Sequence, residues 1–303
     1  MTDFAINNNK SVTDSGSENV AVEIKPRRMN FPFQQVKARK FFNNNTLLSA
    51  FGAVLSGTFP PGEAEFIASV RLYRDRIDNP ELKQQISGFI GQEGHHSHQH
   101  GRANKVLQQL GWDAPWVEQR LAADIRKRNK NKRLGSDKFR LALTAGLEHL
   151  TAIMSEYMLT HPQVLDDLDP TVRELIFWHA VEEIEHKAVA FDLFMLCEND
   201  QKYMQRVLRL GTVMFITKIL RLMVRLMWKA KTIPSWREAK QFWQFMFAEN
   251  GLITQVKTPY KDYFREGFHP WDHNNQELID MWKKQYYRAD HDKGSEQYRS
   301  DTV

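Results

Sequence analysis

The residues with the clearest chemical potential lie in the segment WHAVEEIEHK. His179, Glu183 and His186 stand at positions i, i+4 and i+7, so on a helix at about 100° per residue they fall within an arc of roughly 60°. Glu182 and Glu185 project about 100° and 160° away from Glu183 and are set aside. Taken alone, the segment is either one wall of a metal site or a solvated acidic helix with two histidines.

A second segment, QEGHHSHQH, repeats the pattern. Glu93, His96 and His100 stand at i, i+3 and i+7, again within roughly 60° on a helical wheel, whereas His95 and His98 lie off that stripe. Two separate helices therefore each offer one carboxylate and two imidazoles on one face.

Two further glutamates, Glu63 and Glu148, lie on other predicted helices at matching depths. Glu63 and Glu93 are about 15 and 13 residues from the turn that joins their helices. Glu148 and Glu183 are each about 13 residues from theirs, which places all four carboxylates roughly 20 Å from a turn at 1.5 Å per residue. Two lone glutamates plus two Glu-x-x-His pairs are the pattern with which four-helix bundles hold two metal ions.

Carboxylates with one imidazole per metal favour iron or manganese, and four carboxylates in an apolar bundle need compensating positive charge. The alternative is a polar network without metal. His179 and His100 each lie one turn from a pair, either as a third imidazole ligand or as a donor that orients a carboxylate. His149, one residue after Glu148, has a structural role by default. The predicted metal ligands are Glu63, Glu93, His96, Glu148, Glu183 and His186, with His179 and His100 as further candidates.

The elements that must position these residues are helices, because almost no period-2 alternation occurs, and the predicted fold class is all-α. A short helix over residues 45–55 is expected to end before a turn at Pro60-Pro61-Gly62. A shorter helix covers residues 114–125. The four principal helices are expected over residues 61–77, 80–110, 137–160 and 170–197.

The chain of 303 residues is 42% apolar and carries a net charge of +5, which suits a globular protein with an anionic partner. The single cysteine excludes an internal disulfide, and the N-terminus lacks a signal peptide, so a cytoplasmic location is expected. The predicted organisation is a disordered tail (1–27), a metal-binding bundle (28–200), an amphipathic and aromatic helical extension packed on the bundle (201–290) and a second tail (291–303).

Two basic segments leave alternatives open. Residues 126–140 form either a solvated connection or a patch that faces phosphate or lipid. Residues 203–231 are too often interrupted by charge to span a bilayer, and form either an interfacial membrane helix or a core helix with a basic stripe facing water. That stripe, about 80° wide, comprises Lys218, Arg221, Arg225 and Lys229.

Five blocks in order, between roughly residues 30 and 275, resemble those of the bacterial family of predicted metal-dependent hydrolases: FPPGEAEFIASVR, IGQEGHHSHQHGRAN, LEHLTA, WHAVEEIEHKAVAFD and YFREGFHPWD. That family resembles the ferritin-like diiron proteins, which implies a ferritin-like four-helix bundle. The resemblance implies Glu63 as the ligand of the first block, whereas Glu65 occupies a position that is usually apolar. The stripe through His179, Glu183 and His186 is also similar to that of diiron arylamine N-oxygenases.

Three functions follow as hypotheses. The leading one is an oxygen-activating diiron oxidase or oxygenase, an oxidoreductase that acts on a hydrophobic substrate at or near a membrane. The alternative is a metal-dependent hydrolase that uses a metal-bound hydroxide, and the third is a non-catalytic iron-binding or membrane-adaptor protein.

The expected cofactors are two metal ions, iron before manganese. The expected partners are a hydrophobic or lipid-like small molecule, the inner face of the membrane through residues 203–231, and a second copy in a homodimer. Nucleic acid is not expected, because the basic residues carry no reading motif.

Overall fold

The computed structural model describes residues 23–285, so residues 1–22 of the tail predicted over 1–27, and the whole tail predicted over 291–303, lie outside the described residues. No β-strand forms within this range, apart from an isolated bridge between Phe42 and Leu168. The all-α prediction is confirmed. The α-helices are α1 (Thr46–Arg74), α2 (Pro80–Gln109), α3 (Ala114–Asn129), α4 (Asp137–Thr160), α5 (Pro170–His186), α6 (Val189–Glu198), α7 (Gln201–Lys229), α8 (Trp236–Phe247) and α9 (Leu252–Asp262).

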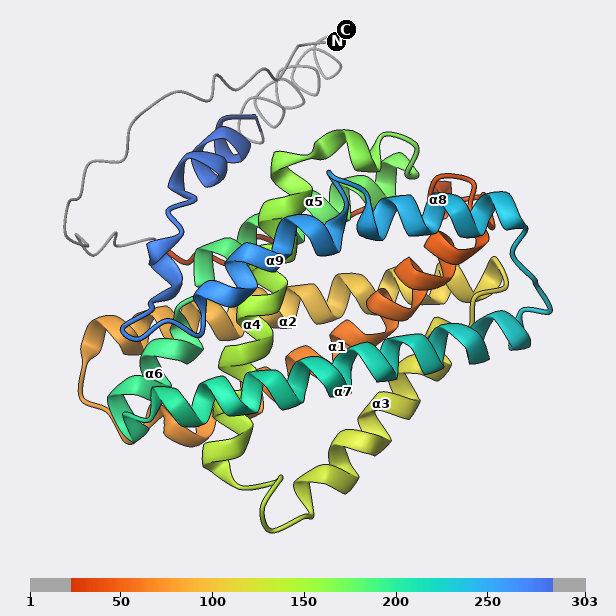
Figure 1. Ribbon diagram of the computed structural model, residues 1–303. Helices are drawn as coiled ribbons and strands as arrows, with labels where there is room; N and C mark the ends of the chain where they lie inside the picture. Colours follow the sequence, from red (N-terminus) through yellow and green to blue (C-terminus); the bar gives the residue numbers. More distant parts are fainter. Residues whose placement is uncertain (1–22, 286–303) are drawn as a thin grey trace, which may run out of the picture.

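Four of these helices, α1, α2, α4 and α5, carry the predicted ligands and surround a common interior (Figure 1). α1 packs on α2, and α4 packs on α5, each pair joined by a short connection. α1 also contacts α4, and α2 contacts α5, so the helices that carry the predicted ligands face one another. Proline at the first turn begins α2 and α5, as the sequence predicts.

The turn predicted at Pro60-Pro61-Gly62 is wrong, because α1 continues through both prolines. Proline has no N–H, so the Ser56 carbonyl loses the helical donor that residue 60 would normally supply. Asn104 Nδ2 of α2 donates to that carbonyl at 3.0 Å instead. A donor from a neighbouring helix therefore stabilises a continuous helix where the local sequence indicates a break.

The helix predicted over residues 170–197 is interrupted, because α5 ends at His186 and α6 begins at Val189. Lys187, at the interruption, is buried, and its Nζ donates to the His273 carbonyl and to Asn275 Oδ1. These partners lie some 90 residues further along the chain, so helical periodicity contains no sign of the anchor. In addition, α3 extends four residues beyond the predicted end at residue 125.

The predicted N-terminal tail reaches Arg27, but its last residues pack closely against α2. A Cβ atom at Gly91 would lie 2.3 Å from Pro26 Cγ, and one at Gly88 would lie 2.3 Å from the Ile24 carbonyl oxygen. Glycine at these two positions therefore permits the close approach. This contact brings Arg27 into the protein interior.

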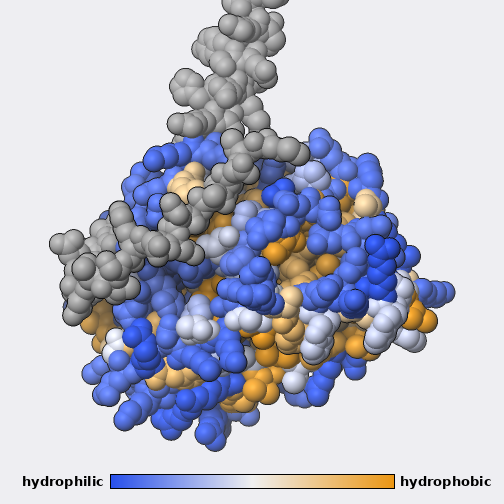
Figure 2. All heavy atoms as spheres, turned by 45° about the horizontal axis from the view of Figure 1, so that its top comes forward, coloured by the Kyte–Doolittle hydropathy of each residue, from blue (hydrophilic) through white to orange (hydrophobic). Residues whose placement is uncertain are grey.

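The C-terminal helices cover one side of the four-helix interior. α7 runs along α1 and α4, while α8 and α9 pack on α1 and α4 respectively (Figure 1). On the face drawn in Figure 2, hydrophobic surface gathers in patches among hydrophilic surface. Among the described residues, no helix combines the length and the apolar character needed to cross a bilayer.

Candidate metal centre

The structure brings all eight predicted ligand side chains into one buried cluster between α1, α2, α4 and α5, and each exposes at most 5% of its surface. Their potential ligand atoms form overlapping groups in which the atoms lie within 4.8 Å of one another. Whether each residue ligates stays a prediction. The groups are Glu63–His100–His179, His96–His179–Glu183, Glu63–Glu93–His96 and Glu93–Glu148–His186.

Many polar atoms in this cluster have no hydrogen-bond partner among the described residues, although unpaired buried polar groups are costly and rare in proteins. The unpaired atoms are nitrogen and oxygen, a donor set that suits manganese, iron or zinc. The residues present therefore fit a bound metal. The atoms are Glu63 Oε1, both carboxylate oxygens of Glu93 and of Glu148, Glu183 Oε2, His96 Nδ1 and His186 Nε2.

The carboxylates of the cluster have strongly shifted acidities. Burial raises the pKa of Glu63 well above its usual range and raises that of Glu148 to about 8. Burial acts in the same direction on Glu183, but the imidazoles of His179, His186 and His96 beside its carboxylate outweigh burial and hold its pKa well below the usual range. Four carboxylates share this enclosed space, and the positive charge of a metal would compensate them.

Hydrogen bonds outside the cluster orient two of the imidazoles. His96 Nε2 lies 3.0 Å from Glu182 Oε2, which leaves Nδ1 toward the cluster. Gln92 donates through Nε2 to Glu185, so its Oε1 accepts from His186 Nδ1 at 2.9 Å and leaves Nε2 of that ring inward. Such partners fix the ring orientation and tautomer of metal-binding histidines.

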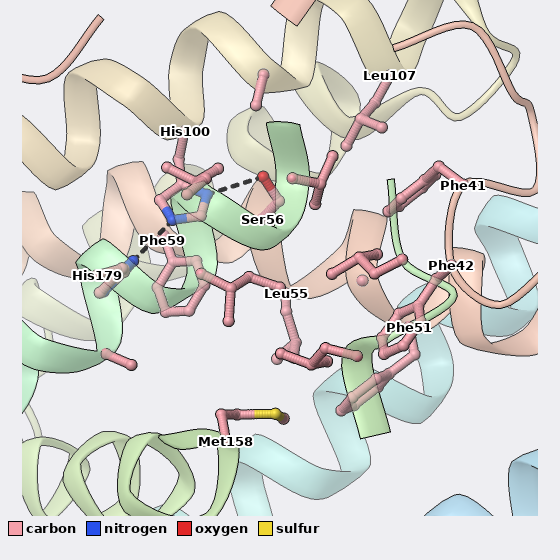
Figure 3. Close-up of a pocket in the computed structure, with 18 of the residues that line it drawn as sticks. Phe41, Phe42, Phe51, Leu55, Ser56, Phe59, His100, Leu107, Met158 and His179 are labelled. Carbon is pink, nitrogen blue, oxygen red and sulfur yellow. Dashed lines mark hydrogen bonds between the residues drawn. The ribbon is translucent and has the colours of Figure 1, made fainter. Parts of the chain in front are cut away.

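A chain of hydrogen bonds assigns different roles to His100 and His179 (Figure 3). Asn104 Nδ2 donates to a backbone carbonyl and a carboxylate, so its Oδ1 accepts from the Ser56 hydroxyl at 2.6 Å. Ser56 Oγ then accepts from His100 Nδ1 at 3.0 Å, and His100 Nε2 accepts from His179 Nδ1 at 2.8 Å. His179 Nε2 keeps its lone pair, 2.8 Å from Glu183 Oε1. The geometry favours ligation by His179 and an orienting role for His100.

The Ser56 hydroxyl offers a test of this chain. Ser56→Ala removes the acceptor of the His100 proton, and we expect metal affinity to fall about tenfold, as is typical when a partner that orients a ligand is lost. Competition with a coloured chelator measures the affinity. Ser155→Ala is the matched control, because Ser155 is equally buried and its side chain lies outside the chain of hydrogen bonds. Unchanged affinity in Ser56→Ala would show that the chain does not act on the metal.

Glu182 and Glu185, set aside in the sequence, are buried beside the cluster. Both accept hydrogen bonds from Arg27, at 2.6 to 3.0 Å, and Lys283 Nζ lies 2.9 Å from Glu185. They do project away from the ligand stripe, but they are not solvated. Sequence reasoning missed this network because Arg27 lies in a polar segment that was assigned to the tail.

Glu65, the glutamate at a usually apolar position, pairs with two arginines of the basic segment 126–140. Arg128 Nη2 and Arg140 Nε contact its carboxylate at 2.6 and 2.7 Å. These two basic residues are therefore part of the fold rather than of a free patch. His149 packs on Tyr263, and burial lowers its pKa to about 3, which agrees with the structural role expected for it.

The fold and the cluster together define an all-helical protein with a buried group of histidines and glutamates that could hold metal. The chain belongs to the family of predicted metal-dependent hydrolases, whose model matches residues 25–274. The resemblance seen in the five sequence blocks is thereby confirmed. Searches of the curated proteins and of the solved structures gave no match.

The family assignment overturns the leading functional hypothesis. The oxygen-activating diiron oxidase or oxygenase, and with it the oxidoreductase class, is wrong, and the family supports the alternative of a metal-dependent hydrolase. The physical reason for the error is that imidazole and carboxylate ligands serve both chemistries. Ligand types and their spacing therefore predict a metal centre without choosing its reaction.

Proposed function

We propose that this protein is a hydrolase whose metal centre activates water. The observation that carries the proposal is the convergence of unpaired, buried carboxylate and imidazole atoms in a member of a predicted hydrolase family. When bound, a divalent metal lowers the pKa of its water ligand and polarises a substrate carbonyl or phosphoryl oxygen. The chain's own part is to hold the donors, orient them and exclude bulk water.

We further propose a ferritin-like four-helix arrangement that holds two ions, with iron or manganese favoured by the carboxylate-rich donor set. Glu93 belongs to two of the groups of nearby ligand atoms, one with Glu148 and His186 and the other with Glu63 and His96. Glu93 would therefore contribute to holding both ions. The imidazoles of His96, His186 and His179 would supply the nitrogen donors.

Other side chains would orient the ligands and exclude water without contacting a metal. The hydrogen bonds of Glu182 and Gln92 hold His96 and His186 in the tautomer that directs a lone pair inward. Phe59 packs against the rings of His100 and His179, with centroids 4.5 and 4.6 Å apart, and shields them from water. A dry, enclosed site strengthens each electrostatic interaction within it.

The experiment loads metal-free protein with manganese, iron or zinc under anaerobic conditions and assays a panel of esters, amides and phosphoesters. Hydrolysis of at least one class is expected without oxygen, with loss on chelation and recovery on adding metal back. Activity that survives complete metal removal would overturn the proposal. So would the absence of hydrolysis with every metal and every class.

A further inference from the structure

We propose that the substrate carries an unbranched apolar chain, which lies in a narrow cavity that ends at the metal centre. This inference rests on the proposed hydrolase function, because it places the hydrolysable group at the metal end. The cavity lies between α1, α2, α4 and α5. His100 and His179 lie at one end, and Phe41, Phe42 and Phe51 lie at the other (Figure 3).

The dimensions of the cavity select a slim ligand. Its wall follows α5 from Val172 to Glu183, which is roughly 16 Å at 1.5 Å per residue. Its volume is about 120 Å³. A cavity of roughly 150 Å³ holds one benzene ring, so this smaller volume favours a short unbranched chain of a few methylene groups over a ring.

The chemistry of the wall selects an apolar chain. Among the described residues that line the cavity, the charged or titratable ones are His100, His179 and Glu183, all at the metal end, and no lysine or arginine lines it. A charged tail would lose its hydration without compensation. Leu55 and Met158 lie between the two ends and offer aliphatic surface (Figure 3).

This arrangement identifies the substrate class as an ester or amide of an unbranched aliphatic acid. The carbonyl carbon would lie beside His179 and Glu183, with the acyl chain directed toward the phenylalanines. Water adds to the carbonyl carbon. The bond from that carbon to the ester oxygen or amide nitrogen then breaks, and the departing oxygen or nitrogen takes a proton from the water. The products are an unbranched aliphatic acid and a free alcohol or amine.

Binding of unbranched primary alcohols to the metal-free, full-length protein tests the chain site by calorimetry. Alcohols carry no carboxylate, so their affinity does not depend on metal. We expect Kd to fall about fourfold for each added methylene until the cavity is full, since each buried methylene contributes about 0.8 kcal/mol. Affinity that does not depend on chain length would overturn the inference.

Two substitutions of Leu55 sharpen the test. Leu55→Trp should block the middle of the cavity and weaken the binding of the unbranched alcohol that fills the native cavity at least tenfold, while Leu55→Ala should admit branched chains that the native protein rejects. Leu47→Trp is the matched control, on the same helix and packed in the same core but outside the cavity. Equal affinity of Leu55→Trp and the native protein for that alcohol would contradict the inference, as would rejection of branched chains by Leu55→Ala.

The outcomes also separate this inference from the proposed function. Metal-dependent hydrolysis of short esters without chain-dependent binding would contradict the chain site and support the hydrolase function. Chain-dependent binding without hydrolysis by any metal-loaded form would contradict the hydrolase function and support an apolar binding site.

A separate observation concerns the outer face of α7 and α8. Val213, Leu220 and Val224 fall within about 40° on the wheel of α7 and are more than half exposed. Trp236 and Trp243 of α8 are exposed as well. Large apolar side chains that are exposed along one helix face are typical of an interaction site.

The charges around this face indicate its partner. Two members of the basic stripe predicted on α7 form ion pairs within the protein. Lys218 pairs with Asp124 of α3, and Lys229 pairs with Asp113, the N-cap residue of α3. Exposed arginines remain on the same helix. They are Arg206, Arg209, Arg221 and Arg225.

We infer that this face rests on an anionic lipid surface. Arginine next to exposed tryptophan and aliphatic side chains is the composition of an interfacial membrane helix. α8 also links this face to the cavity, since Phe242 and Phe245 on its inner side contact Phe51, with centroids 6.1 and 6.5 Å apart. The end of the cavity remote from the metals therefore lies directly beneath α8.

Sedimentation with vesicles tests the membrane face. We expect binding to vesicles that contain phosphatidylglycerol, weaker binding to pure phosphatidylcholine, and release at high salt. The double substitution Val213→Glu with Val224→Glu should reduce binding at least tenfold, whereas Leu196→Glu, at an exposed leucine of α6, should not. Protein that stays in the supernatant at low salt would overturn the inference. So would a native dimer that the double substitution converts to a monomer, because a second copy would then occupy the face.

Discussion

Glu183→Gln is expected to abolish stable metal binding and to reduce hydrolysis by at least about a hundredfold, more than is typical for loss of a partner that only orients a ligand. One carboxylate oxygen of Glu183 is the point on which three imidazoles converge. His179 Nε2 lies 2.8 Å from Oε1, and the nearest nitrogens of His96 and His186 lie 3.5 and 3.6 Å from it. Glutamine keeps the shape but removes the charge that compensates the metal.

Elemental analysis of protein purified without added metal measures the effect. The native chain should retain two ions, and Glu183→Gln should retain fewer than one. Glu174→Gln is the matched control, because Glu174 lies on the same helix at an exposed position. Full metal content in Glu183→Gln would remove the basis for this centre.

The ligand cluster could be predicted from the sequence because its geometry is mostly local. The spacing of His179, Glu183 and His186 fixes a stripe on any helix, whatever packs around it. Equal distances from the turns then align separate helices, since both members of a hairpin rise by the same amount per residue. The eight residues so chosen are the ones that the structure gathers between α1, α2, α4 and α5.

The features that the sequence did not predict depend on contacts between distant segments. The continuity of α1 through Pro60 needs a donor from Asn104, 44 positions later, and the interruption of α5 accompanies an anchor at Lys187 to a segment near residue 275. Local propensity favours a break at the first site and a continuous helix at the second. Tertiary contacts override both preferences.

The type of reaction could not be predicted from the sequence for a different reason. A metal ligand set constrains charge and donor type, while the choice between oxygen activation and hydrolysis depends on what the surrounding cavity admits. The cavity is built by residues such as Phe41, Leu55 and Met158, which in the sequence are indistinguishable from ordinary core residues. Their role follows only from the shape that four helices make together.

Arg27→Met is expected to lower the free energy of unfolding by about 3–5 kcal/mol, as is typical when one partner of a buried ion pair is removed. Arg27 is 9% exposed and donates to Glu182 and Glu185, which are fully or almost fully buried. Methionine fills similar space but leaves both carboxylates without this partner. Urea unfolding measures the change, with Arg28→Met at the exposed neighbouring position as the control.

The loss should also depend on pH in a defined direction. Burial favours the neutral form of Glu185, but Arg27 and Lys283 outweigh it and hold the pKa of that carboxyl below its usual value. The native pairing therefore stabilises the fold above the unfolded pKa of about 4.3, and this stabilisation is lost as pH falls. In Arg27→Met, burial is expected to raise the pKa of Glu185 above its unfolded value. The folded variant then binds a proton more readily than the unfolded chain does, so its free energy of unfolding rises as pH falls. The difference between the two proteins should be larger near pH 8 than near pH 5, and a difference that shrinks with rising pH would contradict the assignment of this network.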